Sequence, residues 1–333
     1  MTATKAWLAP WEARCASSRG LRFVDVTLRG IGQVMFQDNP LSGLLFFIAI
    51  GWGAWAAGVP EVAVAGLVSV LAATLTAYGL RVDAATIGAG LCGFNGYLVG
   101  LALATFMAPT ALMWAGCIFG GAVSVVFTLA MAKVCATWKV PALTAPFVLV
   151  AWLLLLATNA FYGLDGEGLP PAGEIVPIDP TAADPLRLAD FIGGLFTSIS
   201  QVFLKGHGPV AIVLLAGLAV NSVRCAVFAV AGAAVGVVTA HLLGAESELV
   251  TAGLLGFNPV LTAIALGAVF HPRPGVRVTI YALAGAVLSV LVQGAMMALV
   301  TPFGIPTLTA AFVLVTWLFL LPGLSFEPAE RRP

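Results

Sequence analysis

The two halves of this chain contain the same short segments in the same order. The segments pair as QVMF at 33–36 with QVFL at 201–204, GFNGYL at 93–98 with GFNPVL at 256–261, and VPALTAPF at 140–147 with IPTLTAAF at 305–312. Gln33, Phe94 and Thr144 therefore recur as Gln201, Phe257 and Thr309. This pattern predicts a duplicated fold in which both copies contribute to one site.

The composition indicates an integral membrane protein. Hydrophobic residues make up 60% of the chain, charged residues only 9%, and the mean hydropathy is +1.04. Soluble domains carry roughly 25% charged residues. Because lipid offers the backbone no hydrogen-bond partners and the apolar runs show no alternation typical of strands, we expect an all-α membrane protein.

Ten apolar runs are long enough to cross a bilayer, five in each half. They lie at 41–59, 61–80, 90–108, 110–132, 142–161, 208–223, 225–243, 253–270, 276–300 and 307–323. Two further segments, 23–36 and 191–204, are too short to span and are expected to be re-entrant half-helices that carry Gln33 and Gln201 inward. Because each half has an odd number of spans, the two copies enter the membrane from opposite sides. We therefore predict two inverted five-helix repeats around a central pore.

The placement of basic residues supports this inverted arrangement. With the N-terminus in the cytoplasm, every Lys and Arg except Arg187 and Lys205 falls on the cytoplasmic side, as the positive-inside rule requires. We therefore expect a multi-pass protein of the cytoplasmic (inner) membrane with both termini cytoplasmic. The expected parts are an N-terminal arm (1–22), a first repeat (23–161), an external acidic linker (162–190), a second repeat (191–325) and a tail (326–333).

The transported molecule is expected to be neutral. No apolar run carries an Asp, Glu, Lys or Arg well inside it, whereas proton relays and voltage sensors depend on such groups. The side-chain amide of Gln33 and the hydroxyl of Thr144 can donate and accept without charge, and phenylalanine rings offer flat apolar faces. These residue types suit a small planar amide. We expect no catalytic set, metal, cofactor or nucleic-acid partner, and the five cysteines are expected to be buried thiols.

At these residues the chain resembles a known family. PALTAPF at 141–147 is similar to the LPxxTxPF signature of the urea transporters, and QVMFQDNP at 33–40 is similar to the segment before their first span. The resemblance covers about residues 20–325 and fits a bacterial urea channel similar to the vertebrate urea transporters. It implies passive, channel-like urea transport with one pore in each subunit of a homotrimer embedded in membrane lipid. The pore positions implied are Gln33, Phe36, Phe94, Leu98, Thr144, Gln201, Phe257, Leu261 and Thr309.

The second copy departs from this pattern in a few places. Leu204 stands where the first copy has Phe36, so we expect the neighbouring Phe203 to supply a ring in its place. Lys205 and His207 replace polar uncharged residues beside Gln201 and are predicted to modulate the pore mouth. Ala311 replaces Pro146.

Alternative functions remain open at this point. A channel for ammonia, water or another short amide would use the same neutral lumen. An ion-coupled amide carrier is disfavoured by the missing intramembrane charge, although backbone oxygens can bind sodium. A membrane-embedded enzyme would need a nucleophile, base or metal set that the apolar runs lack.

Overall fold

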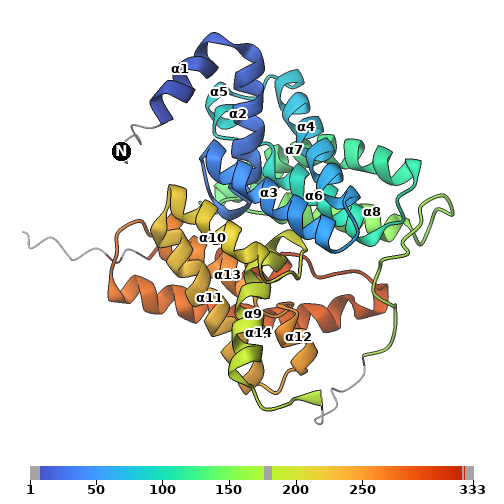
Figure 1. Ribbon diagram of the computed structural model, residues 1–333, viewed down its shortest axis with the longest axis vertical. Coiled ribbons are helices and arrows are strands. Elements are labelled where there is room, and N and C mark those ends of the chain that lie inside the picture. The colour runs from blue at the N-terminus through green and yellow to red at the C-terminus, as the bar shows by residue number, and fades with distance from the viewer. Residues whose placement is uncertain (1–7, 176–181, 325, 327–333) are drawn as a thin grey trace, which may run out of the picture.

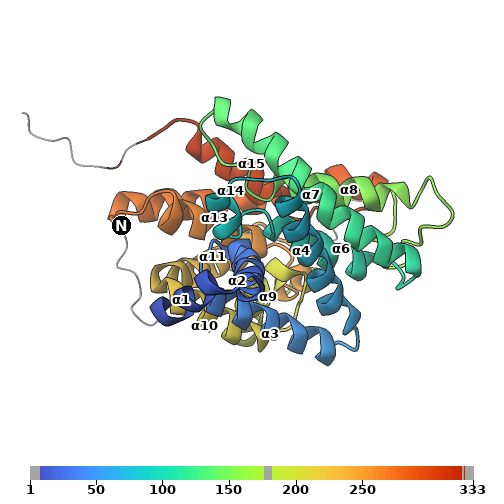
Figure 2. The same ribbon diagram turned by 90° about the horizontal axis from the view of Figure 1, so that it is seen from above.

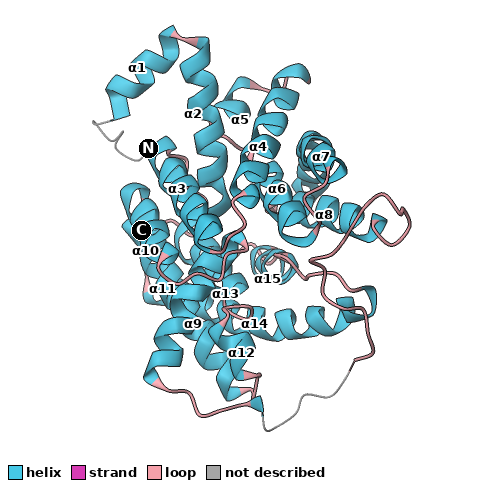
Figure 3. Cartoon of the chain, turned by 45° about the vertical axis from the view of Figure 1, so that its right-hand side comes forward, coloured by secondary structure: helices cyan, strands magenta, loops and turns pink. Residues whose placement is uncertain are grey.

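The computed structural model describes residues 8–175, 182–324 and 326, and every regular element within these ranges is a helix (Figure 3). The all-α prediction agrees with this. Parts of the predicted N-terminal arm (1–7), linker (176–181) and tail (327–333) lie outside the described residues.

The same order of helices occurs twice (Figure 1). The first series follows α1 (Ala9–Ser17) and comprises α2 (Arg19–Gly32), η2 (Gln33–Met35), α3 (Pro40–Ala56), α4 (Glu61–Gly79), α5 (Ala84–Gly88), α6 (Phe94–Phe106), α7 (Ala111–Thr137) and α8 (Ala145–Ala157). The second comprises α9 (Leu188–Ser200), η4 (Gln201–Phe203), α10 (Val210–Asn221), α11 (Val223–Leu242), α12 (Ser247–Thr251), α13 (Phe257–Ile264), the π-helical η5 (Ala265–Val269), α14 (Val276–Val300), η6 (Thr301–Phe303) and α15 (Ala310–Leu320).

Helix length separates two kinds of apolar element. Four segments are long and apolar enough to cross a membrane: α4, α7, α11 and α14 with η6. The α2–η2 and α3 segments together form a fifth candidate, bent by 73° at the break between them. The remaining apolar helices have 10–17 residues. Leu188–Phe203 is the predicted second half-helix, whereas α8 and α15 are short because the left-handed Leu143 and Leu308 interrupt their apolar runs. The predicted total of ten spans stays a prediction.

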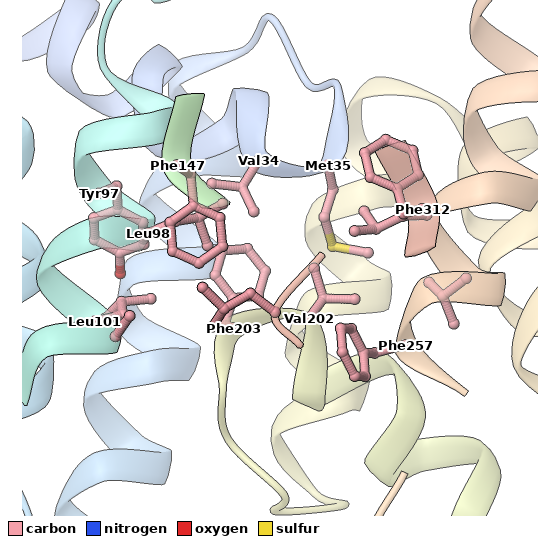
Figure 4. Close-up of a cluster of buried hydrophobic side chains, with 14 of the residues drawn as sticks. Val34, Met35, Tyr97, Leu98, Leu101, Phe147, Val202, Phe203, Phe257 and Phe312 are labelled. Atoms are coloured by element: carbon pink, nitrogen blue, oxygen red, sulfur yellow. The ribbon is translucent and has the colours of Figure 1, made fainter. Parts of the chain in front are cut away.

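The two halves share one hydrophobic core. They meet where α3 packs on α10 and where α8 packs on α15 (Figures 1 and 2). Figure 4 shows buried side chains of the first copy, such as Leu98 and Phe147, in one cluster with Phe203, Phe257 and Phe312 of the second. The copies are therefore halves of a single bundle.

The α3–α10 contact depends on a glycine. A β-carbon added at Gly217 of α10 would lie 2.7 Å from Cε1 of Phe46 on α3. The Phe46 ring is fully buried and packs against Phe203, with 5.5 Å between the ring centroids. Because the ring is enclosed, it has no room to move away from a larger residue.

We predict that Gly217→Val destabilises the protein, since overpacking a buried contact costs about 1–3 kcal/mol. Thermal unfolding of the purified protein in detergent measures this as a lower midpoint. Gly51→Val is the matched control, because Gly51 lies on α3 where an added β-carbon meets nothing within 4 Å. Equal midpoints for the two variants would contradict the proposed packing.

Candidate functional site at the junction of the two repeats

Thr144 and Thr309 meet at the centre of the molecule. Their hydroxyl oxygens lie 2.6 Å apart, and both residues are buried. Each is the residue immediately before a short apolar helix, Thr144 before α8 and Thr309 before α15. The two positions that match in the repeated sequence are therefore in direct contact, and the N-termini of two helices converge on them.

Left-handed residues produce these helix starts. Leu143 has a φ of 54° and Leu308 a φ of 52°. This conformation costs a residue with a side chain roughly 1–2 kcal/mol, and such strain persists only where the surrounding structure enforces it. The break allows α8 and α15 to begin inside the bundle, each after a short stretch of backbone that lies outside any helix.

Asn95 and Asn258 each satisfy one backbone N–H in the first turn of these two helices. The side-chain oxygen of Asn95 accepts from the backbone N–H of Phe147 at 3.2 Å, and that of Asn258 accepts from Phe312 at 3.0 Å. The first N–H groups of a helix have no partner within the helix. Both asparagines are fully buried, so they replace the water that would otherwise be needed there.

Two tryptophans tie the copies together reciprocally. Trp152 Nε1 donates to the carbonyl of Pro306 at 2.8 Å, and Trp317 Nε1 donates to the carbonyl of Pro141 at 2.7 Å. Each indole comes from the helix that follows one threonine and reaches the chain that precedes the other. These bonds hold the two broken segments in register with each other.

Gln33 and Gln201 lie at the C-terminal ends of the two predicted half-helices, directly after α2 and α9. Nε2 of Gln33 donates to the carbonyl of Ala89 at 2.8 Å. Oε1 of Gln201 is buried and has no hydrogen-bond partner in the described structure. Each half-helix ends in a left-handed residue, Phe36 with a φ of 62° and Leu204 with a φ of 58°.

A cavity of about 360 Å³ opens on the linker side of the site. Its wall includes Gln201, Leu204 and Phe257, which the sequence marked, together with Gln293 and Thr307. Phe106 and the linker residues Pro170 and Pro171 also contribute. The linker therefore forms part of the cavity wall, which goes beyond the tether expected from its composition.

Aromatic rings gather around the other half-helix. The ring of Phe36 packs edge-on against Phe270, at 6.0 Å between centroids, and against Phe312, at 6.1 Å. Phe36 thus reaches from the first copy into the second. Phe94 is half-buried at the start of α6. Leu98 and Leu261 lie in the buried core on α6 and α13.

Phe203 lies away from the cavity wall described above. Its side chain is fully buried and packs against Phe46 and against Tyr97 (Figure 4), whereas Leu204 lines the cavity. The expectation that Phe203 replaces the ring missing at Leu204 is not supported by this placement, because moving Phe203 would empty a packed core site.

Lys205 and His207 lie beside α3. The Lys205 side chain is buried against Gly53, and the His207 ring packs edge-on against Trp52, at 5.8 Å between centroids. Neither lines the cavity. Their predicted effect on the pore mouth stays a prediction.

Some central residues were missed by motif reading. Asn95 and Asn258 are part of the repeated GFN segment, and Trp152 and Trp317 continue the repeated threonine segment, so the repeat itself held the signal. The repeat gave no signal for Gln293, because the matching position in the first copy is Thr128. Gln293 accepts from Asn258 at 2.8 Å and donates to Thr307 at 2.9 Å, whereas Thr128 accepts from Asn95 at 3.1 Å.

The described residues contain no group of three His, Cys, Asp or Glu side chains placed to hold a metal ion. All five cysteines are free and buried. The chemistry available at the centre is hydrogen bonding by uncharged groups.

A duplicated apolar helical bundle with broken helices and uncharged polar groups at its centre defines a multi-pass membrane transport protein. The family model described as "Urea transporter" matches residues 24–323. The chain is 30% identical to urea transporter 1 of Ovis aries over 309 residues, 91% of this chain and 78% of the sheep protein. It is 30% identical to urea transporter 1 of Mus musculus over 319 residues, 94% of this chain and 80% of the mouse protein. The chain belongs to the urea transporter family, and it is a transport protein and not an enzyme.

We predict that Trp317→Phe destabilises the protein by about 1 kcal/mol, because the partly buried carbonyl of Pro141 loses its hydrogen-bond partner. Thermal unfolding in detergent provides the measurement. Trp55→Phe is the control, since Trp55 on α3 is 74% exposed. A Trp317→Phe midpoint equal to that of the control would show that the indole bond does not hold the two copies together.

Proposed function

We propose that the chain conducts urea passively, down its concentration gradient, along a path that passes between the two copies at Thr144 and Thr309. Membership of the urea transporter family supports urea as the substrate. The contact between the two threonine hydroxyls carries the assignment of the path, because it joins two short helices, one from each copy, that begin at the junction between the copies. In this proposal, residues 23–161 and 191–325 form the inverted repeats and 162–190 the external linker.

The electrostatics of the centre favour a neutral solute. The N-terminus of a helix carries a partial positive charge of roughly half an elementary charge, and α8 and α15 both begin at the threonine pair. Two converging positive ends disfavour cations, and half-helix ends are known to exclude protons and cations from pores. A neutral molecule with strong dipoles is not repelled by these positive helix ends.

The uncharged polar groups match the hydrogen-bonding capacity of urea, which has one carbonyl and two amino groups. A hydroxyl has one donor and two acceptor positions, so the paired threonines keep a free donor and free acceptor positions for the solute. The unpartnered Oε1 of Gln201, in the cavity wall, can accept an N–H of urea. Gln33 is the matching group of the other copy.

Phenylalanine rings would restrict the path to thin, planar solutes. We propose Phe36 and Phe94 as the slot on the side of the first half-helix and Phe257 on the side of the second. Leu98 and Leu261 lie on the same helices as Phe94 and Phe257 and would narrow the path between the two slots. A ring presents no oxygen to replace the hydration shell of an ion, so the same slot also opposes ion permeation.

We also propose a homotrimer in the cytoplasmic membrane of a bacterial cell, with both termini in the cytoplasm. The resemblance to the urea transporters supports the trimer, and the distribution of basic residues supports the orientation. Each subunit would hold its own path.

Urea permeation can be measured in liposomes by stopped-flow light scattering, with empty liposomes as the reference and no ion gradient. We predict that Thr144→Val and Gln33→Leu each lower the urea permeability about tenfold or more, because each removes a polar partner worth about 1.5 kcal/mol. Thr74→Val is the matched control, since buried Thr74 bonds only its own helix, at the carbonyl of Val70.

Permeability equal to that of the control in folded Thr144→Val and Gln33→Leu would show that the path lies elsewhere. Permeability of the unchanged protein equal to that of empty liposomes would reject passive urea conduction.

The aromatic slot makes a separate prediction. Phe94→Ala is expected to admit methylurea, because removing the ring widens the slot. The measurement is the ratio of methylurea to urea permeability in the same liposomes. Phe161→Ala is the control, as Phe161 is 63% exposed after the end of α8. A ratio unchanged by Phe94→Ala would assign Phe94 to packing alone.

A further inference from the structure

One cluster of charged residues has no part in the path proposed above. Arg29, on the last turn of α2, lies among three carboxylates. Nε of Arg29 donates to Asp25 at 2.9 Å, Nη1 donates to the Asp38 carboxylate at 2.7 Å, and Nη2 lies 3.6 Å from Glu12. The side chains of Arg29 and Asp25 are only 11% and 7% exposed. We name Arg29, Asp25 and Asp38 the arginine clamp.

The clamp joins the two sides of the bend at Phe36. Arg29 precedes the bend on α2, and Asp38 follows it just before α3. Nη1 of Arg29 also donates to the backbone carbonyl of Asp38, at 3.3 Å. Arg29 therefore fixes the backbone position of the segment after the left-handed Phe36, and two bonds from one guanidinium nitrogen define an orientation as well as a distance.

The second copy forms the same bend without a clamp. Relative to the shared glutamine, the positions of Arg29, Asp25 and Asp38 are taken by Thr197, Gly193 and Gly206. Thr197 instead donates to the carbonyl of Thr251 at 2.6 Å. Leu204 still adopts the left-handed conformation. The clamp is therefore not needed to make the bend.

What the first copy has and the second lacks is a ring at the bend. Phe36 must keep its edge-on contacts with Phe270 and Phe312 of the other copy, whereas Leu204 lines an open cavity. The bend at Phe36 thus has to be oriented more closely than the bend at Leu204. An oriented guanidinium anchor meets this requirement.

The N-terminal helix α1 docks on the same clamp. The two carboxylate oxygens of Asp25 have different partners. Nε1 of Trp11 donates to Oδ1 at 2.7 Å, and Nε of Arg29 donates to Oδ2. Glu12 adds the third carboxylate. Figure 1 shows α1 turning into α2 at the N-terminal end of the chain. The contacts of α1 are thus continuous with those that orient Phe36.

We propose that Arg29 is a positioning residue for solute selection: the clamp, with α1 docked on it through Trp11, orients Phe36 and so sets the width of the slot at one end of the path. The role rests on the proposed urea conduction. A looser clamp is predicted to change which solutes pass. The slot at the Phe36 end then depends on the clamp, whereas the Leu204 end of the path does not.

The test compares Arg29→Gln with Arg22→Gln in full-length protein reconstituted in liposomes. Both variants remove one positive charge from α2, but Arg22 is exposed and outside the clamp. Arg29→Gln is expected to raise the ratio of methylurea to urea permeability several-fold, and Arg22→Gln to leave it unchanged. An unchanged ratio in folded Arg29→Gln would overturn the proposal.

Milder variants keep the test decisive if Arg29→Gln fails to fold. Asp38→Asn keeps the size of the side chain and removes its charge, and Trp11→Phe keeps an aromatic ring and removes the indole donor, so both should raise the ratio of methylurea to urea permeability. If both leave it unchanged, the clamp is only structural. In a double-mutant cycle, Asp38→Asn should add little to Arg29→Gln, because both changes weaken the same contact between Arg29 and Asp38. Absence of urea permeation in the unchanged protein would reject the proposed function instead, so the two failures are distinguishable.

Discussion

The structure depends on bringing two helix N-termini together inside an apolar bundle. Unpaired N–H groups in such a place are costly, because neither lipid nor packed side chains offer a partner. Asn95 and Asn258 meet that requirement for α8 and α15, and the threonine hydroxyls satisfy each other between the helices. The left-handed leucines, the tryptophan bonds and the placement of α6 and α13 all support this junction.

Duplication explains how such a junction can form. Each broken segment presents a proline carbonyl to an indole of the other copy, so the same interaction is made twice. A bundle built from two similar halves needs only one set of complementary groups. The shared core around Phe46 and Phe203 then makes the halves inseparable.

The copies nevertheless differ at their two bends, which are the ends of the proposed path. The first has a ring at the bend and a buried Arg29 network, and the second has Leu204, an open cavity and a glutamine oxygen without a partner. Gln293 also replaces the shorter Thr128 and extends the polar network to Thr307. The duplicated fold thus has a junction that both copies share and two bends that differ between the copies.

The sequence by itself determined the medium, the helical class, the duplication and the family, because composition and repeated motifs report directly on burial and on which positions are used twice. It also marked Thr144 and Thr309. Only the tertiary structure decided what these residues touch: that the two threonines bond each other, that Phe203 is core while Leu204 lines a cavity, and that Arg29 ties α1 to the bend at Phe36. Neighbouring residues such as Phe203 and Leu204 point in different directions after a left-handed turn, and side chains far apart in the chain meet only when the helices pack. A pattern in one dimension does not contain that information.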